Sequence, residues 1–302
     1  MVAAGVAAAA FTCRPAAGLG PVAYTRAAKR HVVDPATCRD RVVGSWRFLR
    51  TAPPGVVVRS TGYGKTAKQT IWANGRPIFT EREYDPASKG MAAPGPIWLF
   101  SLTPDRRWLL FTIDPYSSAS IAADGLVLRV ISTAGGPVRT LGTMLTYSDY
   151  RTWCGGRLVF TGGEDRIAWH DKRLLTASPP DWRARPLVPN AGRAWGSLAC
   201  APDGRGVVVQ TQPASDETRF GHAHWALVRV GFDGSVRALT SPPPGSSDET
   251  PRFAGSTLFF VRSTNLHGAL YALRSGRVAG PFARLGFSFG YYGHHDWPYT
   301  PR

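Results

Sequence analysis

The sequence predicts an all-β fold, a six-bladed β-propeller closed by strands from both termini. Four bursts of strand-forming apolar residues recur along the chain and end at residues 111, 160, 209 and 261. A period of roughly fifty residues with several short strands per unit is typical of a β-propeller. The 33 glycines and 25 prolines among 302 residues suit a chain dense in turns.

The clearest unit shows how one blade is built. It contains four apolar strands, with a Pro-Asp-Gly turn after the first and an Asp-Gly turn before the last. Its segments are Trp195–Cys200, the turn Ala201–Arg205, Gly206–Gln212, Trp225–Val230, the turn Gly231–Gly234 and Ser235–Thr240. Proline presets φ at the first central turn position, and glycine accepts the positive φ that tight hairpins need. This unit therefore predicts a four-stranded antiparallel blade.

Five further units follow the template with different completeness. Three of them run over 97–141, 150–175 and 250–281, and the second is expected to use Arg166–His170 as its third strand. At the front, 21–43 predicts a blade without its first strand, and 45–81 predicts one that begins with a strand at Ser45–Leu49.

The end of the chain offers the strand that the opening blade lacks. Phe287–Tyr292 and Trp297–Tyr299 are apolar and aromatic. A strand from this end would close the ring and remove exposed sheet edges. We therefore expect a single propeller domain over residues 21–302, preceded by a signal-like or disordered segment over residues 1–20.

The repeat resembles a known family pattern. Cys200–Val209 with Gly231–Thr240, and Asp248–Phe253 with Leu258–Val261, resemble the WD40-like repeat of TolB-type propellers. The resemblance covers 95–282 best. Such proteins act in envelope protein complexes or as propeller domains of peptidases, so the resemblance implies a fold and leaves the function open. Because repeats begin near residue 21, we expect no copy of the additional N-terminal domain of TolB proteins.

The chain is strongly basic, with a formal net charge of +16. Only five of its 36 basic residues are lysines, and an excess of Arg, Ala, Gly and Pro is what a GC-rich genome produces. The alternative is attraction to a polyanion such as a wall polymer or lipid headgroups. No interleaved aromatic and basic residues indicate RNA binding, so we expect no nucleic-acid partner.

The N-terminus bears on the compartment. Residues Met1–Phe11 are small and apolar with Ala-x-Ala spacing, as in a secretory signal, although the basic n-region is missing. We expect an extracytoplasmic protein, or a cytoplasmic one if this segment is not a signal. Cys13 raises the alternative of lipidation, but Thr12 stands where a lipobox has Gly or Ala. No stretch is long and apolar enough for a transmembrane helix.

Four cysteines are compatible with two disulfides in an oxidising compartment. Cys154 and Cys200 fall at the same place in two adjacent repeats, at the end of the first strand. Equivalent positions of adjacent blades approach each other near the propeller axis, so a Cys154–Cys200 bridge is expected. Cys13–Cys38 is the second possible pair. No CxxC pair exists, and we expect no metal and no cofactor.

Two segments interrupt the repeat and carry the candidate binding residues. In the first, His222 and His224 alternate and could face one side as Zn or Cu ligands, but no third ligand is visible. In the second, His294, His295, Asp296 and Trp297 stand where the ring should close, either as a ligand site or as a hydrogen-bonded closure strand. Asp248 and Glu249 precede a first strand and suit turn or capping roles.

No residue set in the sequence indicates a reaction. No nucleophile elbow is present, and no catalytic residues are assigned. We therefore expect a monomeric, non-catalytic exported propeller that acts as a binding or assembly scaffold for a protein or an anionic envelope component. The alternative is a propeller hydrolase or lyase, or a metal-binding protein, with its site at the channel mouth.

Overall fold

The protein is described from a computed structural model. It covers residues 11–45, 52–62, 67–82, 96–113, 125–215, 224–264, 267–287 and 293–302. These residues form antiparallel sheets almost throughout, and the helical element among them is one 3-10 turn, η3 (Ser148–Tyr150). Within the same residues, no helix has the length and apolar character needed to cross a bilayer.

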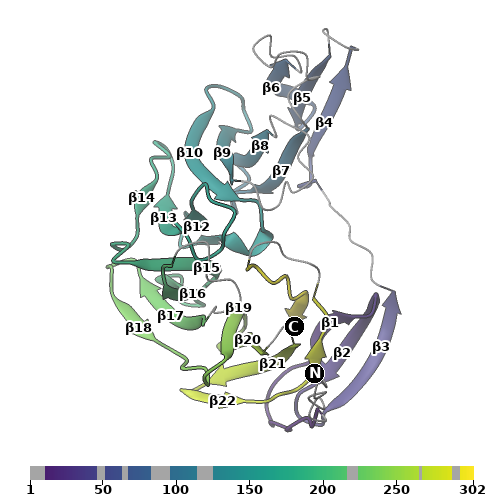
Figure 1. Cartoon of the computed structure of the whole chain (residues 1–302). Coiled ribbons are helices and arrows are strands. Elements are labelled where there is room, and N and C mark those ends of the chain that lie inside the picture. Colours follow the sequence, from purple (N-terminus) through teal and green to yellow (C-terminus); the bar gives the residue numbers. More distant parts are fainter. Residues whose placement is uncertain are drawn as a thin grey trace, which may run out of the picture.

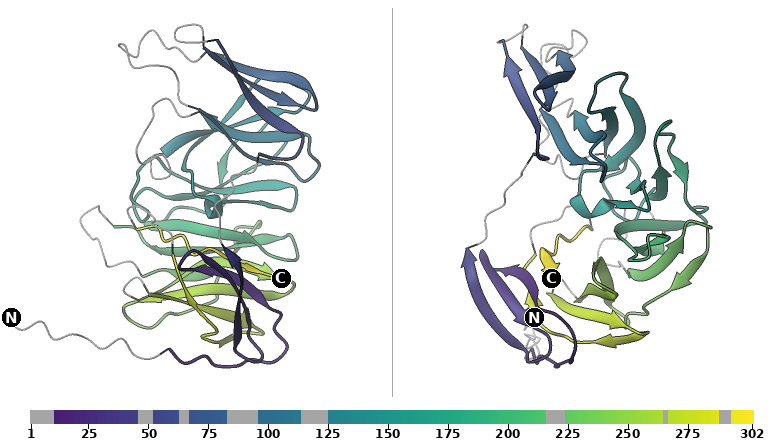
Figure 2. Two further views of the ribbon diagram at one scale, coloured as in Figure 1. Left: turned by 90° about the vertical axis from the view of Figure 1, so that its right-hand side faces the viewer. Right: turned by 180° about the vertical axis from the view of Figure 1, so that it is seen from behind.

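Six sheets follow one another along a curved, open arc, with the first sheet at its lower right end and the second at its upper end (Figure 1). Seen from the side, they succeed one another with their strands running across the molecule (Figure 2). The first sheet has the order β24-β1-β2-β3, from β24 (Tyr299–Pro301), β1 (Val22–Arg26), β2 (Lys29–Asp34) and β3 (Arg39–Ser45). The second is β4 (Val56–Thr61), β5 (Lys68–Ala73) and β6 (Arg76–Arg82).

The next three sheets each contain four strands in chain order, and the sixth contains four such strands and a fifth. The third is β7 (Ile97–Leu102), β8 (Trp108–Ile113), β9 (Gly125–Ser132) and β10 (Arg139–Leu145). The fourth is β11 (Arg151–Cys154), β12 (Arg157–Gly162), β13 (Arg173–Ala177) and β14 (Arg185–Pro186). The fifth is β15 (Arg193–Cys200), β16 (Gly206–Pro213), β17 (Ala226–Gly231) and β18 (Val236–Ala238). The sixth is β19 (Ser246–Ala254), β20 (Thr257–Thr264), β21 (His267–Arg274) and β22 (Arg277–Ala279), with β23 (Arg284–Leu285) also paired to β21.

Both ends of the chain meet in the first sheet, as the sequence predicted. Strand β24 pairs with β1, so that Tyr299 lies opposite Tyr24. Trp297, just before β24, is fully buried in the core shared with the sixth sheet. Its indole lies flat on Gly268, where an added Cβ would come 2.5 Å from a ring carbon. Glycine is therefore required at this contact.

The N-terminal residues of the described chain pack against this same region. Cys13 is bonded to Cys38, with a Cα separation of 6.0 Å. The backbone N–H of Arg14 donates to Pro281, and that of Ala16 donates to Pro35. Residues 1–10 and most of the signal-like segment lie outside the described part.

One predicted strand is wrong. Residues 166–170 form turns, and the third and fourth strands of this sheet are β13 and β14. The carboxylate of Asp165 explains the difference, because it accepts the backbone N–H of Ile167 at 2.7 Å and lies 2.8 Å from the ring Nδ1 of His170. Such local side-chain bonds favour a turn over a ladder. The strand predicted at Ser45–Leu49 lies outside the described residues, apart from Ser45 at the end of β3.

The inner strands start at one face of the ring and end at the other in short hairpins. Cys154 and Cys200 end β11 and β15, and they are bonded with a Cα separation of 5.1 Å. At the start of the inner strands the regular ladder is interrupted: register shifts occur in β7, β15 and β19, and η3 precedes β11. Such bulges change the direction of side chains and are common next to functional sites.

Candidate functional site

A short C-terminal segment crosses the start of the inner strands and connects non-adjacent sheets. We call residues 293–299 the C-terminal clasp. Its two histidines point to two different carboxylates: His294 binds Asp149 in η3, and His295 binds Glu249 in β19. The clasp thereby links the fourth sheet to the sixth through side chains, in addition to the pairing of β24 with β1.

The first pair is almost completely buried. The Nε2 of His294 lies 3.1 Å from both carboxylate oxygens of Asp149, and the hydroxyl of Ser197 donates to the same carboxylate at 2.5 Å. Burial on its own would raise the pKa of Asp149, but the charge and hydrogen bond of His294, together with Ser197, lower it to about 2. Asp149 is therefore ionised at neutral pH, and His294 donates from Nε2.

Two tyrosines enclose this imidazole. The ring of Tyr147 stacks on His294 at a centroid distance of 3.6 Å, and Tyr150 meets it edge-on at 5.2 Å. Burial, followed by the charge of Asp149, raises the pKa of Tyr150 well above its ordinary value. The Oη of Tyr150 and the Nδ1 of His294 are both buried without a hydrogen-bond partner among the described residues. Polar atoms in this position are usually satisfied by ordered water.

The second pair repeats the arrangement with more exposure. The Nδ1 of His295 lies 3.0 Å from Glu249, which also accepts the hydroxyl of Ser263 at 2.5 Å and the indole N–H of Trp297 at 3.1 Å. The side chain of His295 is 19% exposed, against 3% for Glu249. Burial lowers the pKa of His295, but the hydrogen bond and charge of Glu249 outweigh it, so the pKa is raised overall.

The two carboxylates occupy equivalent positions in the repeat. Cys154 and Ala254 both end an inner strand at a matching hairpin, where they pair with Arg157 and Thr257. Asp149 and Glu249 each stand five residues before these strand ends. The repeat therefore places an acid at the start of two inner strands, and the clasp provides one histidine for each.

The neighbouring acid has a separate partner. Asp248 is fully buried and forms a two-bond ion pair with Arg262, at 2.7 and 2.8 Å. The predicted turn or capping role of Asp248 and Glu249 is wrong, because both belong to strand β19 and are buried. Sequence reasoning did not pair Asp149 or Glu249 with the clasp histidines, and it missed Ser197 and Ser263. A hairpin-based alignment of the inner strands would have shown that the two acids are equivalent.

The connectivity of these groups argues against nucleophilic catalysis. In a catalytic triad, the histidine lies between the acid and the nucleophile, so that it can take the hydroxyl proton. Here the carboxylate lies in the middle in both clusters, and Ser197 and Ser263 donate directly to it. Within the described ranges, no group of three or more His, Cys, Asp or Glu side chains is arranged to hold a metal ion.

The other predicted site residues are placed as follows. His222 lies outside the described residues, so the proposed His222–His224 pair is not visible. His224 is exposed, and its Nδ1 lies 2.9 Å from the carbonyl of Ser246. Asp296 is half-buried and stands in the sequence between His295 and the buried Trp297.

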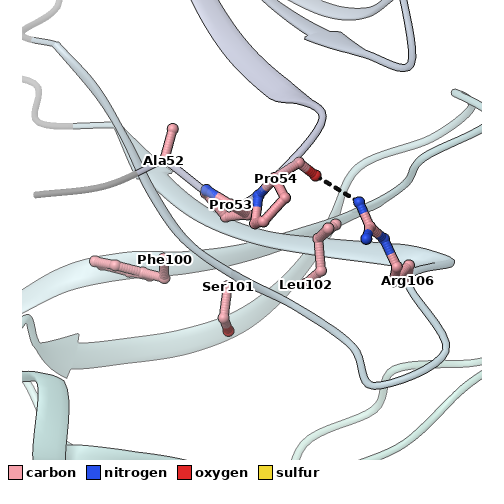
Figure 3. Close-up of a pocket in the computed structure, with 7 residues that line it drawn as sticks. All are labelled: Ala52, Pro53, Pro54, Phe100, Ser101, Leu102 and Arg106. Carbon is pink, nitrogen blue, oxygen red and sulfur yellow. Dashed lines mark hydrogen bonds between the residues drawn. The ribbon is translucent and has the colours of Figure 1, made fainter.

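Two cavities border the described sheets. One of about 140 Å³ lies beside the clasp, lined by Thr25, Arg26, Ala27, Ala28, Gly286, Phe287 and Pro298. Phe287 is 37% exposed and contacts His295 edge-on at 6.2 Å. A larger cavity of about 340 Å³ lies between the second and third sheets (Figure 3), lined by Ala52, Pro53, Pro54, Phe100, Ser101, Leu102 and Arg106.

The comparisons with known proteins find a likeness to solved structures alone. No protein-family model matches the chain, and no curated protein matches it in sequence. The solved structures that it resembles include TolB proteins and several enzymes. A putative TolB from Agrobacterium tumefaciens is 14% identical over 91% of this chain and 90% of its own, with a TM-score of 0.46.

Two enzymes show a likeness of the same degree. A puromycin hydrolase is 14% identical over 89% of this chain, with a TM-score of 0.45, and this chain spans only 44% of it. An oligogalacturonate lyase in complex with manganese is 14% identical, covers 86% of this chain and 72% of its own, and has a TM-score of 0.45. Likenesses at this level concern the fold and extend to no function.

Proposed function

We propose that this chain is a non-catalytic, extracytoplasmic six-bladed propeller that acts as a monomeric scaffold for a protein or an anionic envelope component. The observation that carries the proposal is that the histidines of the clasp are already engaged in hydrogen bonds within the protein. Both histidines of the clasp are bound to carboxylates that also accept serine hydroxyls. These groups serve to tie three sheets together and leave no nucleophile beside a base.

In this proposal each of the six sheets is one blade. Five of them contain an inner strand that pairs with the second strand of the sheet, and β24 fills this position in the first. The second sheet has three described strands, with β4 at its inner edge. The predicted segment Ser45–Leu49 would supply its fourth strand, which remains a prediction.

The two disulfides support a location outside the cytoplasm, because such bonds persist in oxidising compartments. They also bear on the N-terminus. Cys13 uses its sulfur in the bond to Cys38, so it has no thiol left for a lipid. We propose that a signal, where present, is cleaved before Cys13.

The partner would meet the face that contains the clasp. Phe287 is exposed there, beside a cavity of about 140 Å³, which is close to the size of an engineered cavity of about 150 Å³ that accepts benzene. Arg26 lines the same cavity with a guanidinium that is 45% exposed and lies 3.6 Å from Asp40. An apolar side chain next to an acidic group would suit this position.

One observation favours an enzyme as the second candidate. Glu249 binds the Nδ1 of His295, which leaves Nε2 as the nitrogen that could act as a general base. As an enzyme, the protein would catalyse hydrolysis or elimination at the same face.

Two measurements on matched variants separate these functions. Immobilised wild type, Phe287→Ser and Val236→Ser are exposed to solubilised envelope proteins and to vesicles that contain phosphatidylglycerol. Val236 is an exposed apolar residue on β18, away from the clasp, and serves as the control. We expect the wild type and the control to retain the same ligand and Phe287→Ser to lose it; equal retention by all three contradicts a partner site beside the clasp. Turnover of ester, glycoside or uronate substrates that is lost in His295→Gln would replace the scaffold with the enzyme.

A further inference from the structure

The hairpin after β7 departs from the repeat at one residue. In the fifth sheet, Gly204 occupies the turn with φ +65°, and its N–H donates to Ala201 at 2.9 Å. In the third sheet, Arg106 occupies the same place with φ +58°, and its N–H donates to Thr103 at 2.8 Å. The two turns therefore have the same geometry, but one has arginine where the other has glycine.

The arginine is sterically disfavoured at this position. A positive φ brings Cβ close to the neighbouring carbonyl oxygen, so L-residues other than Gly, Asn and Asp rarely adopt it. Residues kept in such conformations cluster at ligand sites, where the strain serves a purpose.

The side chain crosses to the neighbouring sheet and forms one wall of a cavity. Its Nη2 donates to the carbonyl of Pro54 at 2.7 Å, as Figure 3 shows. The guanidinium is exposed, and this hydrogen bond uses one of its five N–H donors. The carboxylate on the same turn, Asp105, accepts the hydroxyl of Thr103 and the backbone N–H of Arg107.

The remaining lining is apolar. Pro53 and Pro54 lie above Leu102 and Phe100, while the hydroxyl of Ser101 points away from the prolines (Figure 3). That hydroxyl accepts the indole N–H of Trp153 at 3.2 Å. The ring of Phe100 is fixed by the guanidinium of Arg151, which lies 3.9 Å from its centroid. The floor is thus held in place by the fourth sheet.

The size and chemistry of this cavity define a ligand class. A volume of about 340 Å³ falls within the range of about 300–1,000 Å³ that is common for small-molecule sites. The floor is suited to an aliphatic chain, and the exposed guanidinium at the edge is suited to an anionic head, to which Arg can donate two parallel hydrogen bonds. The net charge of +16 adds a field of the same sign.

We propose that the cavity between the second and third sheets binds a small amphiphilic carboxylate, with its aliphatic chain on Phe100, Leu102 and Pro53 and its carboxylate on Arg106. This site is separate from the clasp and does not depend on the function proposed above. It assigns a role to a residue that the repeat alone would replace with glycine.

The test measures binding of octanoate to the full-length protein. Two further probes each lack one part of octanoate, either its charge or its aliphatic chain. Binding is measured by ligand-observed saturation-transfer NMR, with octan-1-ol as the uncharged chain and acetate as the anion without a long chain. We expect saturable octanoate binding in the millimolar range or tighter, with weaker binding of both other probes. The variant Arg106→Gly restores the repeat's own turn residue, so its melting temperature should equal or exceed that of the wild type. Its octanoate affinity should fall by about 2- to 5-fold, as expected for loss of an ion pair at an exposed guanidinium.

Arg107→Gln is the matched control, because it removes the same charge one residue away and Arg107 does not line the cavity. We expect octanoate binding close to that of the wild type. Equal weakening by both variants would show a general charge effect and overturn the site. Absence of saturable octanoate binding, or unchanged binding by Arg106→Gly, would also overturn it. An octanol affinity equal to that of octanoate would refute the role of Arg106.

Discussion

Replacing Asp149 by asparagine tests how much the clasp stabilises the fold. The substitution keeps the size of the side chain and removes the charge that His294 and Ser197 bind. The pKa of Asp149 falls from 3.8 to about 2 on folding. At about 1.36 kcal/mol per pKa unit, this depression corresponds to a stabilisation of roughly 2 kcal/mol at pH 7. Asp149→Asn should therefore lower the free energy of unfolding by about that amount.

The pH dependence gives a sharper test than the magnitude. Because the folded pKa is depressed, the contribution of Asp149 is complete above the unfolded pKa and is lost as pH falls through the folded value. Linkage predicts roughly 2 kcal/mol at pH 7 and about half of that at pH 3. The difference between wild type and variant should shrink accordingly, because asparagine does not titrate.

Urea unfolding followed by tryptophan fluorescence at pH 7, 5, 4 and 3 measures this difference. Asp171→Asn is the control, since its ion pair with Arg173 is exposed and such pairs contribute about 0–1 kcal/mol. A difference for Asp149→Asn that is below about 0.5 kcal/mol at pH 7 would refute the stabilising role. A difference of equal size at pH 7 and pH 3 would refute the assignment of the effect to this carboxylate's charge.

Three further predictions concern the contacts around the clasp and the inner strands. The pKa of His295 is raised on folding, so its charged pair with Glu249 stabilises the fold below the unfolded pKa of about 6.5, and this stabilisation is lost as pH rises through the folded pKa. In urea titrations, His295→Gln should therefore destabilise the fold more at pH 5.5 than at pH 9. The opposite order would contradict a raised pKa. Gly268→Ala places a methyl group against the indole of Trp297, and we expect the free energy of unfolding to fall by about 1–3 kcal/mol in thermal unfolding. Gly276→Ala is the control: nothing lies near its Cβ, but its φ is +76°, so it reports backbone strain alone. Replacing Cys154 and Cys200 together by serine should cost about 2–4 kcal/mol in urea unfolding, because the bond closes a loop with a sequence separation of 46; an unchanged free energy of unfolding would contradict its stabilising role.

The sheets were predictable because their signals are local. A turn such as Ala201–Arg205 and the strands on either side of it are contiguous in sequence, so the hairpin pattern alone places β15 and β16. The pairing of β24 with β1 was also expected, because the opening unit lacked a first strand. Prediction failed at 166–170, where the bonds of Asp165 to Ile167 and His170 make a turn from a strand-like sequence.

The buried acids were less accessible to sequence reasoning. Glu249 stands in a polar run, Ser246–Thr250, that reads as a surface turn, yet the whole run is buried. The C-terminal clasp contacts Glu249 and Thr250 from nearly fifty residues away, and Trp225 and Gln210 bond to Asp248 and Thr250, so no local pattern reports the burial. Asp149 is 145 residues from His294. Only the matching distance of both acids from a repeat hairpin was available as a signal.

We expect the affinity of the proposed partner for Phe287 to depend on the contacts that hold the clasp in place. Phe287 is placed by edge contacts with His295 and with Trp297, and both of these side chains are bound to Glu249. Glu249→Gln should therefore act at two levels. It weakens the charged contact to His295, which lowers the free energy of unfolding, and it loosens the rings that support Phe287, which weakens the partner. If Phe287 bound its partner independently of the clasp, Glu249→Gln would change stability and leave the affinity unaltered. A parallel loss of both would show that the buried carboxylate positions the binding surface, which is the role that its central place between Ser263 and His295 suggests.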